Sequence, residues 1–191
     1  MLTEREIIQR ARENSDAFGQ IIDLYEGKLK RYLFRLGVME TEDQEDLLQE
    51  VFWKSYKNLN DFDDGLSFSS WIYRITRNTA YDFFRKKKSQ GKLQIFSEDV
   101  YDLFWNQLKD ETQDIEKKFD KKQRRKAIAI VLQKVPEKYR EVLILLFLEE
   151  KSYKEISDIL QKKENTVATL LARGKQKFKK LFLQKFNISD F

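Results

Sequence analysis

Apolar residues recur every three or four positions through most of the first ninety residues, the spacing of one buried face on an amphipathic helix. The first series predicts a helix that ends at Gly37, because glycine readily adopts the conformation that stops a helix. Its members are Phe18, Ile21, Ile22, Tyr25, Leu29, Tyr32, Leu33 and Leu36. The pattern therefore predicts helices in this part of the chain.

Two further helices are predicted before residue 90. One begins near Thr41, with Gln44 three residues later completing a capping box, and ends near Asn60. A turn separates it from a helix expected from about Ser67 to Lys88. The turn has the sequence Asp61-Phe62-Asp63-Asp64-Gly65.

Helical periodicity weakens from Ser89 to about Glu116, where acidic residues accumulate. We interpret this stretch as a linker, with a short amphipathic helix over Val100–Leu108 as the alternative. A basic helix is expected beyond it over Phe119–Gln133, and Pro136 is expected at the first position of the next helix.

The last part of the chain predicts a helix–turn–helix unit. Ser152 and Glu155 form a capping box for a short helix over Tyr153–Leu160, and Asn165 is expected to cap a helix over Thr166–Phe182. Such a unit can place its second helix in the major groove of DNA. Many helical proteins contain helix pairs that bind nothing, so the pattern alone leaves DNA binding open.

Composition supports an all-helical chain and excludes several kinds of chemistry. Six Gly and one Pro in 191 residues are too few for the turns of a many-stranded sandwich or barrel. Without Cys or His, the chain has no disulfide, thiol nucleophile or imidazole base, and most zinc sites are excluded. No stretch approaches the roughly 20 apolar residues of a membrane span, so we expect a cytoplasmic protein without membrane insertion.

Charge is distributed unevenly along the chain. Residues 97–116 carry seven acidic side chains and one basic one, whereas residues 117–191 carry 20 basic and nine acidic ones. A basic carboxy-terminal part favours a polyanionic partner, because clustered Lys and Arg displace counterions from nucleic acid. The alternative is a solvated, lysine-rich helical surface.

Two helix faces carry residues suited to binding. The second predicted helix presents Asp46, Gln49, Glu50, Trp53 and Lys57, an aromatic side chain among charges, as in protein-binding hot spots. The third carries a row suited to unpaired bases, on which aromatic rings stack and whose edges Asn can read. This row consists of Trp71, Arg74, Asn78, Tyr81 and Arg85, flanked by Tyr73 and Arg77. In the alternatives, Trp53 covers a neighbouring helix, Trp71 is half in the core, and the Arg side chains are solvated.

Two segments of the chain match conserved regions of a known family in order and spacing. The runs Asp46–Phe52, Phe62–Phe68 and Trp71–Asn78 resemble the second conserved region of extracytoplasmic-function RNA polymerase sigma factors. Val135-Pro136, Tyr139-Arg140, Ser152–Ile156 and Thr166-Val167 resemble their fourth region.

The resemblance implies an all-α fold of two small domains, residues 1–92 and 117–191, joined by a flexible acidic linker over residues 93–116. It implies a sigma factor that directs RNA polymerase core to promoters and catalyses nothing itself, with no cofactor or metal. The first domain would recognise and melt the upstream-ten element, and the second would bind the upstream-thirty-five duplex. Expected partners are core polymerase, promoter DNA and, as a further candidate, an anti-sigma factor. The linker would imitate the charge of RNA near the active-centre cleft.

The family's roles carry over to particular residues. Core polymerase is expected to bind Asp46, Gln49, Glu50 and Trp53. Promoter DNA is expected to contact the first domain at Phe62, Asp63, Asp64, Gly65, Leu66, Trp71, Tyr73, Arg74, Arg77 and Asn78. It is expected to contact the second domain at Asn165, Thr166, Thr169, Arg173, Lys175 and Lys177.

The fourth region departs from the family pattern at two positions. Where relatives carry Gly-Thr-Val-Lys-Ser-Arg, Ala168 and Leu170 replace the two cations. Arg173, Lys175 and Lys177 are therefore candidates to anchor phosphates instead. The sequence leaves open whether Leu170 faces the surface or the core.

Two other functions fit parts of the sequence. A helix–turn–helix regulator that works without polymerase leaves the acidic face and the aromatic row unexplained. An enzyme that holds a metal with Asp63 and Asp64 is disfavoured, because adjacent acids in a turn are usually solvated.

Overall fold

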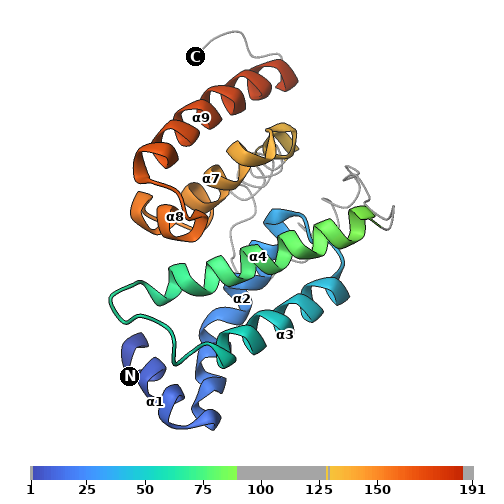
Figure 1. Ribbon diagram of the computed structural model, residues 1–191. Helices are drawn as coiled ribbons and strands as arrows, with labels where there is room; N and C mark the ends of the chain where they lie inside the picture. Colours follow the sequence, from blue (N-terminus) through green and yellow to red (C-terminus); the bar gives the residue numbers. More distant parts are fainter. Residues whose placement is uncertain (1, 90–127, 129, 187–191) are drawn as a thin grey trace, which may run out of the picture. The chain divides into compact units, whose positions relative to one another are not determined.

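The computed structural model describes residues 2–89, residue 128 and residues 130–186, which belong to two compact units (Figure 1). All regular elements in this part of the chain are helices, as predicted. The predicted linker over residues 93–116, its alternative helix over residues 100–108 and most of the predicted helix over residues 119–133 lie outside the described residues. Residues 130–134 are helical.

The first unit packs its helices around α2. Its elements are α1 (Glu4–Glu13), the 3-10 helix η1 (Ser15–Ala17), α2 (Phe18–Leu36), α3 (Thr41–Lys57) and α4 (Phe68–Ser89). Helix α2 contacts α1, α3 and α4, and α3 also packs along α4. The loop that joins α3 to α4 is thereby tied at both ends to packed helices.

Buried tyrosines form the centre of this unit. Tyr25 and Tyr32 of α2 are at most 2% exposed. The Tyr32 ring lies 5.0 Å from that of Tyr73, and the Tyr25 ring lies 5.6 Å from that of Phe68, both measured between centroids. These contacts fix α4 against α2, because aromatic pairs add about 0.5–1.5 kcal/mol to the burial of their area.

Helix α2 spans the predicted apolar series and ends where the sequence predicted. Gly37 follows it with a φ of 121°, a left-handed conformation that a Cβ would strain. The Gly37 N–H donates to the carbonyl of Phe34 at 2.9 Å, which closes the helix terminus. The prediction from the sequence is confirmed here.

Helix α3 begins at Thr41 as predicted, but the predicted capping box is wrong. Glu40 is the residue before the helix, and no side chain caps this terminus. Gln44 is buried, and its side-chain amide donates to the carbonyls of Val38 at 2.8 Å and Met39 at 3.3 Å. The amide therefore supplies hydrogen-bond donors to carbonyls of the preceding loop, because carbonyls removed from water need such partners.

Helix α1 is not among the helices predicted from the sequence. A capping box opens it, in which the Thr3 N–H donates to the Glu6 carboxylate at 2.7 Å and the Glu6 N–H donates to the Thr3 hydroxyl at 3.3 Å. The bonds from the Thr3 backbone and hydroxyl hold the pKa of Glu6 below its ordinary value. Ile7 and Ile8 are buried beside them. The spacing of Thr3 and Glu6 ahead of an apolar pair is the signal that could have predicted this helix.

The second unit contains α7 (Glu137–Phe147), α9 (Glu164–Phe186) and the start of α8 (Tyr153–Leu160). Helices α7 and α9 pack along each other, as Figure 1 shows. The predicted bounds of α8 are confirmed. Its predicted capping box is also present, because the Ser152 N–H donates to the Glu155 carboxylate at 2.9 Å and the Glu155 N–H donates to the Ser152 hydroxyl at 3.2 Å.

Two predicted helix starts in this unit need correction. Pro136 is the N-cap of α7, which begins one residue later than predicted. Asn165 does not cap α9, because that helix already begins at Glu164 and the Lys163 carbonyl accepts the Val167 N–H at 3.1 Å. Gln161 adopts a φ of 52° after α8, so the chain reverses within a short turn and re-enters a helix before Asn165.

None of the helices in the described ranges has both the length and the apolar character needed to cross a bilayer.

The contact of α9 with α7 depends on Gly174. A Cβ at this position would lie 3.3 Å from the backbone oxygen of Tyr139 and 3.3 Å from Cγ of Leu143. Gly174→Leu should lower the free energy of unfolding of the second unit by about 2 kcal/mol, because the backbone of α7 cannot move aside. Gly19→Leu is the matched control, since a Cβ there meets no atom within 4 Å. Urea denaturation followed by circular dichroism measures both, and equal effects would contradict the close packing at Gly174.

Candidate nucleic-acid and protein interfaces

The loop between α3 and α4 presents a tight, polar tip to solvent. The Leu66 N–H donates to the carbonyl of Asp63 at 3.0 Å, and the Gly65 N–H donates to the Asp63 carboxylate at 2.8 Å. Asp63, Asp64, Gly65 and Leu66 are exposed, and Leu66 is the one large apolar side chain among them. These four predicted site residues are accessible to a ligand.

Phe62 anchors this loop in an aromatic cluster. Its side chain is 6% exposed, and its ring lies 5.2 Å from that of Phe68 and 5.3 Å from that of Trp71. Because the ring is buried inside the unit, Phe62 holds the loop in place. The structure therefore places the ring of this predicted DNA-binding residue inside the unit rather than at the exposed tip.

Tyr73 is also a core residue. It is 2% exposed and packs against Tyr32 of α2. Its side chain is enclosed, so the structure does not place Tyr73 on the surface with the exposed residues of the predicted site.

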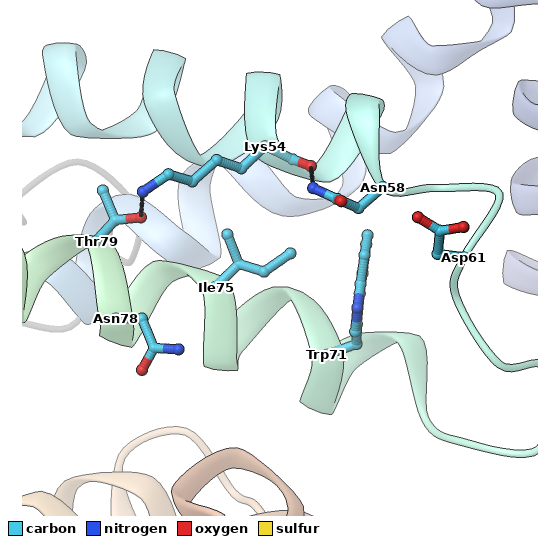
Figure 2. Close-up of a pocket in the computed structure, with 7 residues that line it drawn as sticks. All are labelled: Lys54, Asn58, Asp61, Trp71, Ile75, Asn78 and Thr79. Carbon is cyan, nitrogen blue, oxygen red and sulfur yellow. Dashed lines mark hydrogen bonds between the residues drawn. The ribbon is translucent and has the colours of Figure 1, made fainter.

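A pocket of about 510 Å³ lies between α3, the loop and α4 (Figure 2). Figure 2 shows the Trp71 ring extending from α4 toward Asn58, while the carboxamide of Asn78 points away from α3. The lining residues are Lys54, Asn58, Asp61, Trp71, Ile75, Asn78 and Thr79. The pocket thus brings two predicted residues, Trp71 and Asn78, together with five that were not predicted.

Hydrogen bonds order the α3 side of this pocket. Lys54 Nζ donates to the Thr79 hydroxyl at 3.1 Å and pairs with the Glu50 carboxylate at 2.7 Å. The Asn58 side-chain amide donates to the Lys54 carbonyl at 2.7 Å. A planar indole beside fixed donors and an acceptor, Asp61, suits a nucleobase, which stacks on its face and is read along its edge.

Two arginines of α4, Arg74 and Arg77, lie in sequence between residues that line this pocket. Arg74 and Arg77 are half-buried, and the Arg77 guanidinium carbon lies 4.6 Å from the centroid of the Tyr81 ring. Arg85 pairs with Asp82 one turn away. The predicted row of aromatic and basic residues is therefore ordered along the helix.

Asp63 and Asp64 of the loop each contact a different residue of the protein. Asp64 pairs with Arg12 of α1 at 2.8 Å, and Asp63 accepts the Gly65 N–H. Within the described residues, no three acidic, Cys or His side chains are grouped to hold a metal ion. The two carboxylates considered as ligands of a metal enzyme thus make contacts that stabilise the loop.

The predicted face of α3 is accessible along its length. Asp46, Gln49, Glu50, Trp53 and Lys57 are all exposed. Trp53 is 57% exposed, and Lys57 Nζ lies 4.7 Å from the centroid of its ring. The indole is therefore held over the surface and is not covered by a neighbouring helix.

A groove of about 570 Å³ adjoins this face between α2 and α3. Its apolar lining consists of Phe18, Ile22, Leu48, Phe52, Trp53 and Tyr56, and its polar lining of Glu26, Glu45 and Gln49. An exposed aromatic anchor beside an apolar groove with a polar rim is typical of a protein-binding surface.

Part of the predicted set on α9 forms one exposed row. Asn165, Thr169 and Arg173 recur every four residues and are exposed, with Thr166 beside them. The Thr169 hydroxyl donates to the Asn165 carbonyl at 2.9 Å. Gln176 and Lys180 are also exposed and extend the row at helical spacing, a signal that the sequence prediction did not use.

Lys175 and Lys177 lie toward α7. Lys175 Nζ is 5.3 Å from the centroid of the Phe147 ring, and Lys177 Nζ is 5.7 Å from that of the Tyr139 ring. Ala168 is exposed, and Leu170 is half-buried at the border between the row and the buried residues Val167 and Leu171. Leu170 therefore lies between the two alternatives, neither fully on the surface nor fully in the core.

Two family comparisons match this architecture in chain order. Sigma-70 region 2 matches residues 21–90, and Sigma-70 region 4 matches residues 125–178. The first match contains α3, the loop and α4, and the second contains α7 and α8.

Similar proteins cover nearly the whole chain. The chain is 31% identical over 181 residues to the ECF RNA polymerase sigma factor SigW of Bacillus subtilis (strain 168), covering 94% of this chain and 96% of SigW. It is 35% identical over 159 residues to the RNA polymerase sigma factor SigZ of the same organism, covering 83% of each.

Solved structures share the fold. CnrH in complex with the cytosolic domain of CnrY matches with a TM-score of 0.63 at 22% identity, covering 92% of this chain and 93% of CnrH. The sigma factor RpoE in complex with the anti-sigma factor NepR from Bartonella quintana also matches with a TM-score of 0.63, at 19% identity, covering 86% of this chain and 95% of RpoE.

The burial of Phe62 yields a test of its anchoring role. Phe62→Ala should lower the free energy of unfolding of the first unit by about 3 kcal/mol, because it leaves a cavity against Phe68 and Trp71. Leu66→Ala, in the same loop but at a side chain that is 45% exposed, should change it little. Chemical denaturation compares the two, and a neutral Phe62→Ala would show that the ring is not a core contact.

Proposed function

The chain belongs to the extracytoplasmic-function family of RNA polymerase sigma factors, and we propose that it binds core polymerase and directs it to specific promoters in transcription initiation. The observation that carries this proposal is the presence of both sigma-70 regions, in order, within a chain that aligns with a sigma factor over 94% of its length. A regulator that acts without polymerase does not require the exposed face of α3. We expect the protein in the cytoplasm, where polymerase and chromosomal DNA are found.

The face of α3 is the proposed contact with core polymerase. It offers Asp46 and Glu50 as charges for a basic partner surface and Trp53 as an aromatic anchor beside the α2–α3 groove. Charges at the rim of an interface steer association, and a central aromatic side chain contributes much of the affinity. The mixture of both on one helix face supports a protein partner.

The pocket between α3 and α4 is the proposed site for an unpaired base of the upstream-ten element. Extruding a base costs a few kcal/mol, which stacking and edge contacts must offset. Trp71 would supply a flat surface and Asp61 an acceptor for the base edge, and the exposed Asn78 would turn its carboxamide, which points away from α3, toward that edge. Arg74 and Arg77 on the same helix would hold the phosphates. Asp63, Asp64, Gly65 and Leu66 at the loop tip would meet the neighbouring nucleotides.

The exposed row on α9 is the proposed contact with upstream-thirty-five duplex DNA. Asn165, Thr166, Thr169 and Arg173 are accessible on the second helix of the helix–turn–helix unit. Lys175 and Lys177 would hold phosphates from the side that faces α7. An anti-sigma factor is a further proposed partner, because RpoE, which shares the fold, was solved in complex with one.

The α3 proposal predicts a loss of polymerase binding with retained folding. Asp46→Ala combined with Gln49→Ala should reduce affinity for core polymerase about tenfold, because truncation leaves partner groups unpaired. Gln20→Ala combined with Asp23→Ala, which removes the same side-chain types from exposed positions on α2, should have no effect. Titration of labelled protein with core polymerase provides the measurement. Unchanged affinity of the first variant with normal helicity would reject this face.

The pocket proposal predicts a defect in promoter opening. Asn78→Ala should reduce permanganate reactivity of thymines in the upstream-ten element about tenfold and leave closed-complex formation nearly intact, because base-edge contacts form only after strands separate. Asn78→Asp, which has nearly the same shape but replaces the amide donors with a negative charge, should show at least as large a defect. An equal loss of closed and open complexes would indicate misfolding and count against the pocket.

A further inference from the structure

Arg12 of α1 holds the loop between α3 and α4 through three hydrogen bonds. Its Nε donates to the Leu59 carbonyl at 3.2 Å, its second terminal nitrogen donates to the Phe62 carbonyl, and its first donates to the Asp64 carboxylate at 2.8 Å. The guanidinium carbon also lies 5.8 Å from the centroid of the Phe62 ring. The Arg12 side chain is 16% exposed, so most of it is enclosed by the loop that it binds.

Only arginine can make this set of contacts. The guanidinium presents donors in a rigid plane, which lets one side chain reach two carbonyls and a carboxylate at once. Lysine carries the same charge but concentrates its donors at one atom. The charge and the geometry of Arg12 can therefore be separated by one conservative substitution.

Helix α1 is docked independently of these bonds. Ile7, Ile8 and Ala11 bury one side of the helix, which packs against α2, and the Thr3–Glu6 capping box closes its start. The helix thus serves as a fixed support from which Arg12 reaches the loop. It lies before residue 21, where the match to Sigma-70 region 2 begins.

Two residues that line the pocket, Asp61 and Trp71, adjoin the loop segment that Arg12 binds. Asp61 lines the pocket and lies between Leu59 and Phe62, whose carbonyls Arg12 binds. Trp71 lines the pocket too, and its ring is packed against that of Phe62. A displaced loop would therefore move the acceptor and loosen the stacking surface, while the α3 side, held by Lys54 and Thr79, would stay in place.

We infer that Arg12 is a positioning residue that sets the base selectivity of the pocket. The inference rests on the proposed function, since it assigns to α1 control over which unpaired base the pocket accepts. Arg12 does not line the pocket. It acts by fixing Asp61 and the Phe62–Trp71 contact at the distances that base recognition requires.

The test uses the full chain with core polymerase and a promoter pool randomised over the upstream-ten element. Open complexes are isolated and sequenced for wild type, Arg12→Lys, Arg12→Ala and Arg5→Ala. Arg5 is an exposed cation on the same helix, so its variant controls for lost charge. Thermal unfolding and affinity for core polymerase are measured for each variant.

Arg12→Lys should lower the enrichment of the preferred base at one position about tenfold, the scale of one good base contact, and leave the other positions unchanged. Its core affinity should stay at the wild-type value, its melting temperature should fall by only a few degrees because hydrogen bonds of one loop are lost, and Arg5→Ala should select as wild type does. Retained selectivity in Arg12→Lys would overturn the inference. A uniform loss over all positions would also overturn it, because it would reveal a general folding or charge effect. If the wild-type chain selects no base, the proposed function itself fails, which is a distinct result.

Discussion

The burial of Phe62 between Phe68 and Trp71 is the contact on which the proposed nucleic-acid surface of the first unit depends. The loop tip beyond it is exposed and polar, so it cannot fold by burying its own side chains. One buried ring ties that loop to α4, and Arg12 secures the same segment from α1. Together these contacts hold the loop at a fixed distance from α4, which a selective pocket requires.

Two surfaces of the first unit, one beside the α2–α3 groove and one at the α3–α4 pocket, have compositions suited to different partners. Along α3, Trp53 stands exposed among acids and polar groups beside an apolar groove, a composition suited to protein. Between α3 and α4, Trp71 is half-buried beside Asn78 and close to arginines, a composition suited to bases and phosphates. The difference between the two indoles is burial, because Trp53 projects from the unit while Trp71 is supported by Phe62 and Phe68.

The proposed DNA contacts of the second unit all lie on a single long helix, α9. Val167, Leu171 and the close approach at Gly174 hold α9 against the rest of the unit. The row from Asn165 to Arg173 remains exposed. Ala168 and Leu170 add no charge beside this row, in which Arg173 is the one cation, while Lys175 and Lys177 lie over rings of α7. The residues proposed to anchor phosphates and those proposed to contact bases thus lie on different sides of the helix.

The sequence by itself determined most of the helices and the division of their faces, because burial repeats with the helical period. Helix α1 was not among them, whereas α2 ends at the predicted glycine and α8 has the predicted bounds. Helical spacing also placed Trp53 on an exposed face of α3 and put Trp71 and Asn78 on one face of α4, where both line a pocket. Only the tertiary structure decided that Phe62 and Tyr73 are core residues, that Gln44 serves a loop, and that Arg12 binds residues 47 to 52 positions away. The reason is physical: local periodicity records which side of a helix is buried, but a pocket wall or a long-range hydrogen bond exists only where separate elements meet.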